Sequence, residues 1–474
     1  MLHQMKQIRF HFLCAVLFLS IGSCFPLETT YRVPLHEEGR VIVYLQPLPQ
    51  EASNLRFIID AISAIRSDGS HVPLSPLFNE IKGGELKGFQ KLLATGVLTP
   101  GSYTGLSLMI NKAFVQGEEG EVALFVSEEP ITAGHPFEVR RRQASTLFLS
   151  LEASGAVTDS IRFTPAFSLA GPGGILLNLT GYVSNSASDL ISVFDKKTML
   201  VVDSIATGSG PKGIVLDQRG RRAYVALSGA DAVEVYDLVT GSFISSIKLN
   251  FGDHPSELAI TPDGRTLVST NYGSNTVSII DAIAMFQLQR VRVGQGPVSV
   301  VVDPSGFKAY VMNSLSSTVS VVDLTQRTVT VTIAVEGSPL RGAFNRSGNR
   351  LFVISENSPN LQVIDPSQFR VIEKIFIGMG AASITVSLRT DLILVGKKYD
   401  GEITIVDPLS SMFIDTIRLS GTAAFMTIDR QENTLFVAMP DRRKLLKINL
   451  TSKKTMAEIE VREGACAVVV VGER

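Results

Sequence analysis

The sequence predicts an all-β chain in which an immunoglobulin-like β-sandwich precedes a seven-bladed β-propeller. One unit of four short, β-branched segments separated by turns is clearest in residues 296–337. This unit recurs seven times with a period of about 42 residues, and the residues before the repeats lack that period. Because a single four-stranded blade cannot bury both of its faces, repeats of this length are expected to stack into a ring.

Two markers keep the same phase through the repeats. The residue that closes the third strand of each unit is Asp195, Asp237, Asp281, Asp323, Asp365, Asp407 or Asn449. The residue that opens the first strand is Pro211, Pro255, Pro297, Pro339, Ala381, Ala423 or Ala465. An Asp repeated in every blade is expected to accept hydrogen bonds from the turn that follows it, and not to catalyse a reaction.

The first turn and the ring closure can also be assigned. Glycines that are expected to supply positive φ in the first turn are Gly220, Gly264, Gly306 and Gly348. After a Gly/Pro-rich linker at residues 168–180, the chain enters the ring of residues 181–474 at a second-strand position, Tyr182. Val468 to Val471 lies in phase with the first strands, so the last strand is predicted to close the ring. The competing segment, Ile175 to Leu177, lies about three residues too close to Tyr182.

Residues 1–24 read as a targeting segment. Lys6 and Arg9 precede an apolar run whose length suits a signal-peptide core and is too short for a permanent membrane span. The following Ile21-Gly-Ser-Cys24 resembles the lipobox of bacterial lipoproteins, which implies cleavage before Cys24 and lipid attachment to its sulfur. Phe25 replaces the Asp that signals inner-membrane retention, so the outer membrane is favoured. With Cys14 removed and Cys24 lipidated, Cys466 has no disulfide partner.

Residues 25–167 form the predicted β-sandwich. Alternating and apolar runs separated by turn signals indicate strands, with one helical patch expected near Glu85 to Ala94. The basic run Arg140 to Arg142 is interpreted as a solvated hairpin, and the acidic cluster around Glu119 as a turn, because it lacks the alternation of a calcium-binding loop.

The repeat motifs resemble a known family. YVSN (182–185), YVAL (224–227), YVMN (310–313) and SNTVSIID (274–281) are similar to the YVTN-type propeller repeats of bacterial and archaeal surface and periplasmic proteins. The segment LTPGSYTGLSLMI (98–110) resembles a β-sandwich domain at the start of other bacterial lipoproteins. Together the two domains resemble spirochaete-type surface lipoproteins, which implies adhesion or antigenic display. Propellers of this type also serve redox enzymes, so the fold alone does not decide the function.

One face of the ring is predicted to bind a ligand. The loops between the second and third strands and the connectors between blades are expected to share this face. Its candidate ligand-binding residues are Asp253, His254, Asn271, Tyr272, Asn313, Glu356, Lys397, Lys398, Tyr399, Arg442 and Arg443. The connector from Asn250 to His254 is two residues longer than the others, and insertions on loop-rich faces often carry binding. With Lys444, the basic members of the set are expected to form a positive patch.

Catalysis is less well supported by the sequence. The mature propeller has one histidine, His254, and the chain has no Trp on which a quinone cofactor would stack. The loop carboxylates Glu356, Asp400 and Asp441 are a weak candidate for a lactonase-like cation site. We therefore expect no catalytic residue, no metal and no cofactor. A net charge of −1 without a basic stripe argues against nucleic acid.

The sequence is best interpreted as a lipid-anchored outer-membrane protein, displayed at the cell surface, that binds through its propeller. The expected partner is a protein or glycan, including host extracellular components. The alternative is a periplasmic enzyme or redox accessory of the propeller type, either lactonase-like or cofactor-binding.

Overall fold

A computed structural model describes residues 38–174 and 176–472. The targeting segment, including Cys14 and the predicted lipidation site Cys24, lies outside the described residues. The described residues all belong to one compact unit. Within the described part, no helix has the length and apolar character needed to cross a membrane.

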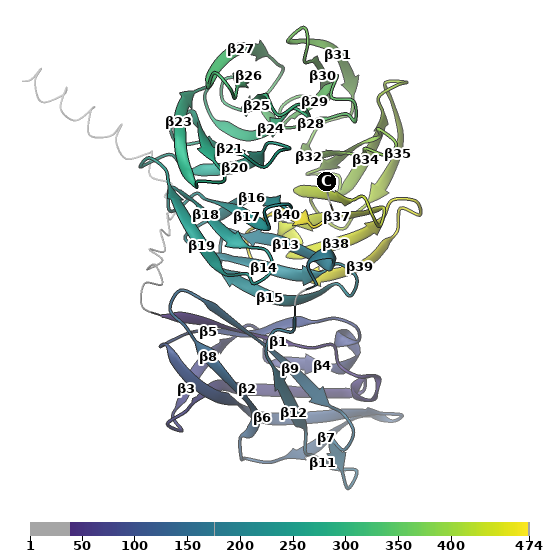
Figure 1. Cartoon of the computed structure of the whole chain (residues 1–474). Coiled ribbons are helices and arrows are strands. Elements are labelled where there is room, and N and C mark those ends of the chain that lie inside the picture. Colours follow the sequence, from purple (N-terminus) through teal and green to yellow (C-terminus); the bar gives the residue numbers. More distant parts are fainter. Residues whose placement is uncertain (1–37, 175, 473–474) are drawn as a thin grey trace, which may run out of the picture. The chain divides into compact units, whose positions relative to one another are not determined.

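The propeller consists of seven four-stranded antiparallel sheets, counted over the described residues, and Figure 1 shows them arranged as a ring. Blade 1 contains β13 (Thr180–Asn185), β14 (Leu190–Asp195), β15 (Leu200–Ala206) and β40 (Ala465–Val470). Blade 2 contains β16 (Pro211–Asp217), β17 (Arg222–Leu227), β18 (Ala232–Asp237) and β19 (Phe243–Lys248). Blade 3 contains β20 (Pro255–Ile260), β21 (Thr266–Asn271), β22 (Thr276–Asp281) and β23 (Phe286–Arg292).

The remaining blades repeat the same order. Blade 4 contains β24 (Pro297–Val302), β25 (Lys308–Asn313), β26 (Thr318–Asp323) and β27 (Thr328–Ala334). Blade 5 contains β28 (Pro339–Phe344), β29 (Leu351–Ser355), β30 (Asn360–Asp365) and β31 (Arg370–Phe376). Blade 6 contains β32 (Ala381–Val386), β33 (Ile393–Lys397), β34 (Glu402–Asp407) and β35 (Met412–Arg418). Blade 7 contains β36 (Phe425–Asp429), β37 (Thr434–Met439), β38 (Lys444–Asn449) and β39 (Thr455–Glu460).

The recurring Asp has the predicted role. In blade 4 the Oδ1 atom of Asp323 accepts the N–H groups of Thr325 and Gln326 at 2.9 and 2.7 Å, and Asn449 does the same in blade 7. Hydrogen bonds within the turn hold the pKa of Asp237, Asp365 and Asp407 below the usual range of Asp. The largest cause is the N–H of Thr240 in Asp237, the hydroxyl of Ser367 in Asp365 and the N–H of Leu409 in Asp407. The marker is therefore a turn cap repeated around the ring.

The first-turn glycines follow the prediction in three of four blades. Gly264, Gly306 and Gly348 adopt φ of 74°, 78° and 71°. In blade 2 the prediction for Gly220 is wrong, because the neighbouring Arg221 takes the positive φ of 53°. A Cβ atom on Gly220 would lie 2.2 Å from a carboxylate oxygen of Asp217, so a larger residue would displace that side chain.

The last strand closes the ring, as predicted. β40 pairs antiparallel with β13, with Val468 opposite Val183 and Val470 opposite Gly181. The competing segment does not form this strand: Leu177–Leu179 is a 3₁₀ helix, η3, and residue 175 lies outside the described residues. The closure adds a buried ion pair, in which the Nζ of Lys196 lies 2.5 Å from the Oδ2 of Asp429 in blade 7.

The N-terminal domain is also all-β. Its strands are β1 (Gly39–Leu45), β2 (Leu55–Arg66), β3 (His71–Pro76), β4 (Glu80–Lys82), β5 (Lys91–Leu98), β6 (Gly101–Gly117), β7 (Gly120–Val126), β8 (Ile131–Val139), β9 (Ala144–Glu152), β10 (Val157–Thr158), β11 (Arg162–Phe163) and β12 (Ala166–Ala170). Their order is β10-β11-β7-β6-β2-β3-β5-β1-β9-β12, with β4 on β2 and β8 on β6. The relation to immunoglobulin-like domains stays a prediction.

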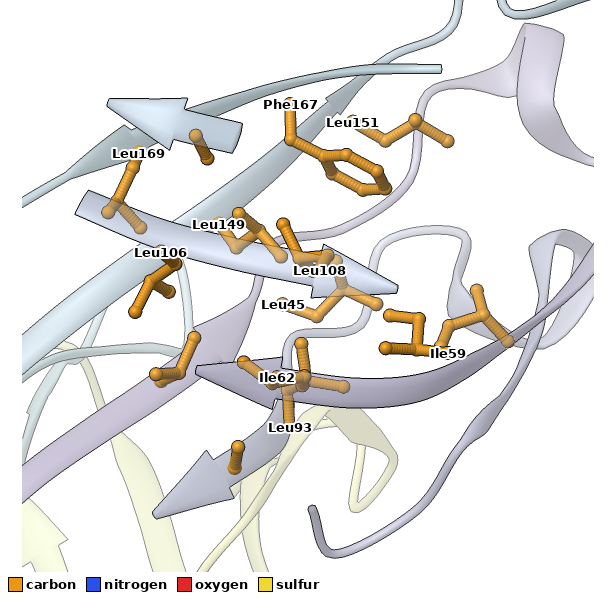
Figure 2. Packing of buried hydrophobic residues seen from close by; sticks show 14 of the residues in the cluster. Leu45, Ile59, Ile62, Leu93, Leu106, Leu108, Leu149, Leu151, Phe167 and Leu169 are labelled. Carbon is orange, nitrogen blue, oxygen red and sulfur yellow. The ribbon is translucent and has the colours of Figure 1, made fainter. Parts of the chain in front are cut away.

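A single apolar core fills this domain. Residues that alternate along long strands supply it, and a register shift between Ile59 and Ala61 keeps both Ile59 and Ile62 in the core. Figure 2 shows these two with Leu106, Leu149 and Phe167 of β12. Such alternation buries one face of each strand and leaves the other to solvent. The helix predicted near Glu85 to Ala94 is wrong. η1 (Gln50–Ala52) and η2 (Gly83–Leu86) are short 3₁₀ turns, and residues 91–98 instead form β5, paired with β1.

The N-terminal domain and the propeller are in contact. The last strand of the N-terminal domain, β12, pairs with β9 through Ala170, and the predicted domain boundary at residue 167 stays a prediction. A shared apolar cluster joins the two domains, with Ile42, Tyr44 and Phe148 packed with Phe194 and Val201 of blade 1. The side chain of Gln90 adds two hydrogen bonds to the backbone of Val201, at 2.8 and 3.0 Å.

Candidate functional site

The connectors between blades and the loops between second and third strands lie on one face, as predicted. Backbone hydrogen bonds link the two kinds of loop, as between Ser314 N–H and the Gly296 carbonyl at 2.8 Å and between Lys398 N–H and the Gly380 carbonyl at 2.7 Å. We call this surface the loop face. The structure assigns its predicted ligand-binding residues to two groups, those used inside the fold and those presented to solvent.

The inserted connector is rigidly held. Asp253 is fully buried; it accepts the N–H of Asn250 at 2.9 Å and pairs with the guanidinium of Arg290 at 2.6 Å. Asp231 accepts the N–H groups of Gly252 and His254 at 2.8 and 2.7 Å. Asp253 therefore supports the connector from a buried position, and its role as a ligand contact stays a prediction.

His254 also belongs to this support. Its backbone takes a left-handed φ of 47°, and its Nδ1 lies 2.8 Å from the carbonyl oxygen of Ser228. The imidazole covers Gly273, where a Cβ atom would lie 2.5 Å from its Cδ2. The imidazole of His254 keeps the connector that leads into blade 3 against the loop between β21 and β22.

Asn271 and Asn313 are buried and structural. The Nδ2 group of Asn271 donates to the hydroxyls of Thr276 and Ser278 at 3.0 and 2.8 Å. The Nδ2 group of Asn313 donates to the equivalent hydroxyls five and seven residues later in its own blade. Both amides brace the loop between the second and third strands, and their role as ligand contacts stays a prediction. The repeated spacing of Asn with Thr and Ser was a sequence signal for this bracing.

Lys397 is buried as well, contrary to prediction. Its Nζ donates to the carbonyl oxygens of Ile377, Gly378 and Met379, at 2.5, 2.9 and 3.2 Å. Burial lowers the pKa of this ammonium, and the nearby charges of Asp400 and Glu402 oppose the shift. Three carbonyls are the acceptors that a buried ammonium needs. Lys397 therefore fixes the connector between blades 5 and 6.

The expected positive patch is largely neutralised. Lys398 pairs with Glu356 at 3.5 Å, Arg443 with Glu460 at 2.7 Å, and Lys444 with Glu458 at 2.5 Å. Arg442, in η4 (Pro440–Arg442), donates its Nε–H to the carbonyl of Ser420 at 2.8 Å. Arg442 and Arg443 also line a cleft of about 440 Å³, together with Glu458, Glu460 and residues of the 78–91 segment. Each of the three ion pairs joins one positive and one negative charge, so the pairs add no local excess of positive charge.

Beside these charged pairs, the loop face presents several large apolar and aromatic side chains to solvent. Phe251, in the inserted connector, is wholly exposed. Four further large side chains on loops of this face are exposed: Tyr272, Leu315, Met379 and Tyr399. Two of them rest on connectors, since a Cβ atom on Gly296 would lie 2.6 Å from Leu315 and one on Gly380 would lie 2.8 Å from Tyr399. Of the predicted residues, Tyr272 and Tyr399 thus remain in this exposed group.

A second constellation, not predicted from the sequence, lies at the propeller axis. Arg341 of β28 pairs with Glu257 of β20 at 2.6 Å, and its guanidinium carbon lies 4.5 Å from the ring centroid of Phe425 in β36. Burial raises the pKa of Glu257, and the charge of Arg341 opposes the shift. The sequence signal was side-chain size. These three residues lie two positions after the first-strand marker of their blades, where the other four blades have Gly, Ala or Ser.

The carboxylates considered for a cation do not converge. Glu356 faces Lys398, and Asp441 accepts the N–H of Thr422 at 3.1 and 3.2 Å. Among the described residues, no group of three or more His, Cys, Asp or Glu side chains is placed to hold a metal ion.

The comparisons with known proteins identify the fold. No family model and no curated protein matches the chain. This chain matches the solved structure of hydrazine synthase from Kuenenia stuttgartiensis with TM-score 0.51 and 17% identity, over 56% of this chain and 90% of that one. A functionally unknown protein from Desulfotomaculum acetoxidans matches with TM-score 0.56 and 13% identity, over 62% and 99%. At these identities the likeness concerns the fold alone, and the fold is that of a β-propeller.

Proposed function

We propose that this protein is a lipid-anchored surface protein that binds another protein through the loop face of its propeller. The observation that carries the proposal is Phe251, a wholly exposed aromatic side chain on the one connector that is longer than the others. A large apolar side chain in water is unfavourable for an isolated protein, and it becomes favourable when a partner covers it.

The connector is built to present this side chain. The residues on both sides of Phe251 are fixed by Asp253 and Asp231, and Asp253 is itself paired with Arg290. An aromatic residue on a rigid loop loses little conformational entropy when it is bound. Tyr399 and Leu315 are expected to lose little conformational entropy for the same reason, because they pack against connectors at Gly380 and Gly296.

The chemistry favours a protein partner with an apolar pocket. Aromatic anchors surrounded by polar side chains are typical of binding hot spots in protein interfaces. Lys398 and Arg443 are paired with carboxylates, so a strongly anionic ligand would first have to displace Glu356 and Glu460 from them. Attachment through Cys24 is the part of the proposal that rests on the sequence alone.

The test uses the full chain and a panel of extracellular matrix proteins, namely fibronectin, laminin and collagen, in a solid-phase binding assay. Phe251→Ser is compared with Phe307→Ser, because Phe307 is also exposed but lies in the turn between β24 and β25, on the opposite face. Removing a hot-spot aromatic side chain costs about 2 kcal/mol of binding free energy, which weakens binding about thirtyfold.

We expect Phe251→Ser to bind at least one panel member about thirtyfold more weakly, and Phe307→Ser to bind it like the unaltered protein. Both variants are expected to keep the thermal stability of the parent, since neither side chain is buried. Equal binding by the two variants, or no binding by the parent to any panel member, contradicts the proposal.

A further inference from the structure

The propeller has a second face, opposite the loop face, on which the turns between first and second strands lie. We call these the first turns. They lie next to the propeller axis, because the first strands of successive blades, such as β16, β20 and β24, contact one another around the ring. In blades 2 to 6 the first turns span residues 217–222, 261–266, 303–308, 345–350 and 387–392.

The first turns of blades 2 to 6 touch their neighbours. Cβ atoms on Gly264, Gly306 and Gly348 would lie 2.8 to 3.2 Å from atoms in the first turn of the preceding blade. Between blades 5 and 6, the N–H of Arg346 donates to the Oδ1 of Asp391 at 2.9 Å. The five turns therefore form one continuous arc beside the axis, which we call the inner arc.

Five exposed arginines lie on the inner arc. Arg219 and Arg221 are in blade 2, Arg265 in blade 3, Arg346 in blade 5 and Arg389 in blade 6. In the part of the chain that the structure describes, none of the five guanidinium groups lies within ion-pair distance of a carboxylate. Their N–H donors are therefore available to a binding partner.

The carboxylates of the inner arc are used by its own backbone. Asp217, Asp263, Asp303 and Asp391 each accept the N–H group of a residue in a first turn. Only Asp263 among them is exposed. The hydroxyl of Thr261 is the largest cause that lowers the pKa of Asp263, and the charge of Arg265 is a smaller one. The exposed charge of the inner arc is thus predominantly positive.

The Asp caps of the turns between third and fourth strands confine this positive charge to the inner arc. Those turns lie two strand spacings farther from the axis, about 9–10 Å. Exposed charges are screened over about 8 Å at physiological ionic strength. An anionic bilayer would cover both kinds of turn and would meet the Asp caps as well as the arginines. A single polymer chain can follow the inner arc alone.

We propose that the inner arc binds an acidic polysaccharide, a linear glycan that carries sulfate or carboxylate groups. A planar guanidinium binds such oxyanions through two parallel N–H groups, and Arg is preferred to Lys where this geometry matters. Single-stranded nucleic acid would also need aromatic side chains on which its bases stack. The five turns contain one aromatic residue, Phe307. The inner arc is separate from Phe251 on the loop face, so this proposal does not depend on the function proposed above.

Two triple variants remove the same charge from opposite faces. The inner-arc variant carries Arg219→Gln, Arg221→Gln and Arg265→Gln. The control variant carries Lys398→Gln, Arg442→Gln and Arg443→Gln on the loop face. All six side chains are exposed, so both variants are expected to fold, which circular dichroism checks. Because the change in net charge is equal, a difference in binding reports where the charge lies.

The probes are fluorescein-labelled heparin, which is sulfated, hyaluronan, which carries carboxylates alone, and uncharged dextran. The full chain is titrated against each by fluorescence polarisation at about 50 and 150 mM NaCl. We expect saturable binding of heparin or hyaluronan and none of dextran. The inner-arc variant should bind about tenfold more weakly, because three exposed charge contacts of a few-fold each are lost. Its slope of log Kd against log salt should fall by about two to three.

The control variant and Phe251→Ser should bind the acidic probes like the parent. Absence of saturable binding of both heparin and hyaluronan, or equal weakening in the two triple variants, overturns the proposal. Binding of phosphatidylglycerol vesicles or of a single-stranded oligonucleotide as tight as that of the acidic glycans also overturns it, since the inner arc would then not select a polysaccharide.

Discussion

Replacing Lys196 by Met tests the closure of the ring at its most buried polar contact. Lys196 follows β14 of blade 1, and its Nζ donates to Asp429 Oδ2 at 2.5 Å and to the carbonyl of Val471 at 2.6 Å. The two side chains are 1% and 0% exposed. Met fills a similar volume and keeps the packing of the aliphatic stem, so the substitution removes the charge and its two bonds.

The expected loss is about 3–5 kcal/mol, because breaking a buried ion pair leaves the other charge without a partner in a place that water cannot reach. This corresponds to a change of about two to four orders of magnitude in the unfolding equilibrium. Lys398→Met is the control: Lys398 and Glu356 are about half exposed, and such a pair contributes about 0–1 kcal/mol.

Urea unfolding followed by circular dichroism measures both variants, since the chain has no Trp for fluorescence. In Lys196→Met the amides of β13 and β40 should also exchange hydrogen faster, because these strands form the closure. Adding Asp429→Asn should recover part of the loss, since it removes the unpaired charge and keeps an acceptor for the turn. Equal stability of Lys196→Met and Lys398→Met would refute the role given to this pair.

Three further outcomes are expected. Lys397→Met should lower the stability by about 2 kcal/mol, measured by the same urea titration, because three carbonyls lose their donor; a neutral effect would return Lys397 to the candidate ligand contacts. Asp203→Asn should stabilise the protein more at pH 7 than at pH 4. Burial raises the pKa of this carboxyl, so the wild-type protein is most stable with Asp203 protonated and loses that stability as the pH rises through the folded-state pKa; thermal melts at the two pH values decide it, and a constant difference would contradict it. Cys24→Ser should abolish labelling of the protein by radioactive palmitate in cells, and equal labelling would rule out the lipid anchor.

The blades were predictable because their markers perform the same local task seven times. An Asp that caps the same turn must recur at the same place in each repeat, and its partners are only two and three residues away. The closure of the ring by the last strand was predictable for the same reason, because Val468 to Val471 lies in phase with the first strands of the other blades. The segment at residues 85–94 was not, because its tertiary pairing with β1 overrides a local pattern that suits a helix.

The site was harder to predict, since the sequence shows which residues lie on a loop but not which way they face. Lys397 and Asp253 look like surface charges in the sequence. Lys397 instead donates to backbone carbonyls of a connector about 20 residues earlier, and Asp253 accepts a backbone N–H of its own connector. Glu257 and Arg341 are separated by 84 residues, and only the ring brings them together. Their one visible signal was a large side chain where other blades carry a small one.

The most direct measurement of the central claim is the digestion of intact cells that express the full chain by proteinase K. A protein that binds partners at the cell surface must expose its propeller there. We predict that the propeller is degraded in intact cells while a periplasmic marker survives. Complete protection of the propeller until the outer membrane is permeabilised would contradict the account and favour a periplasmic function.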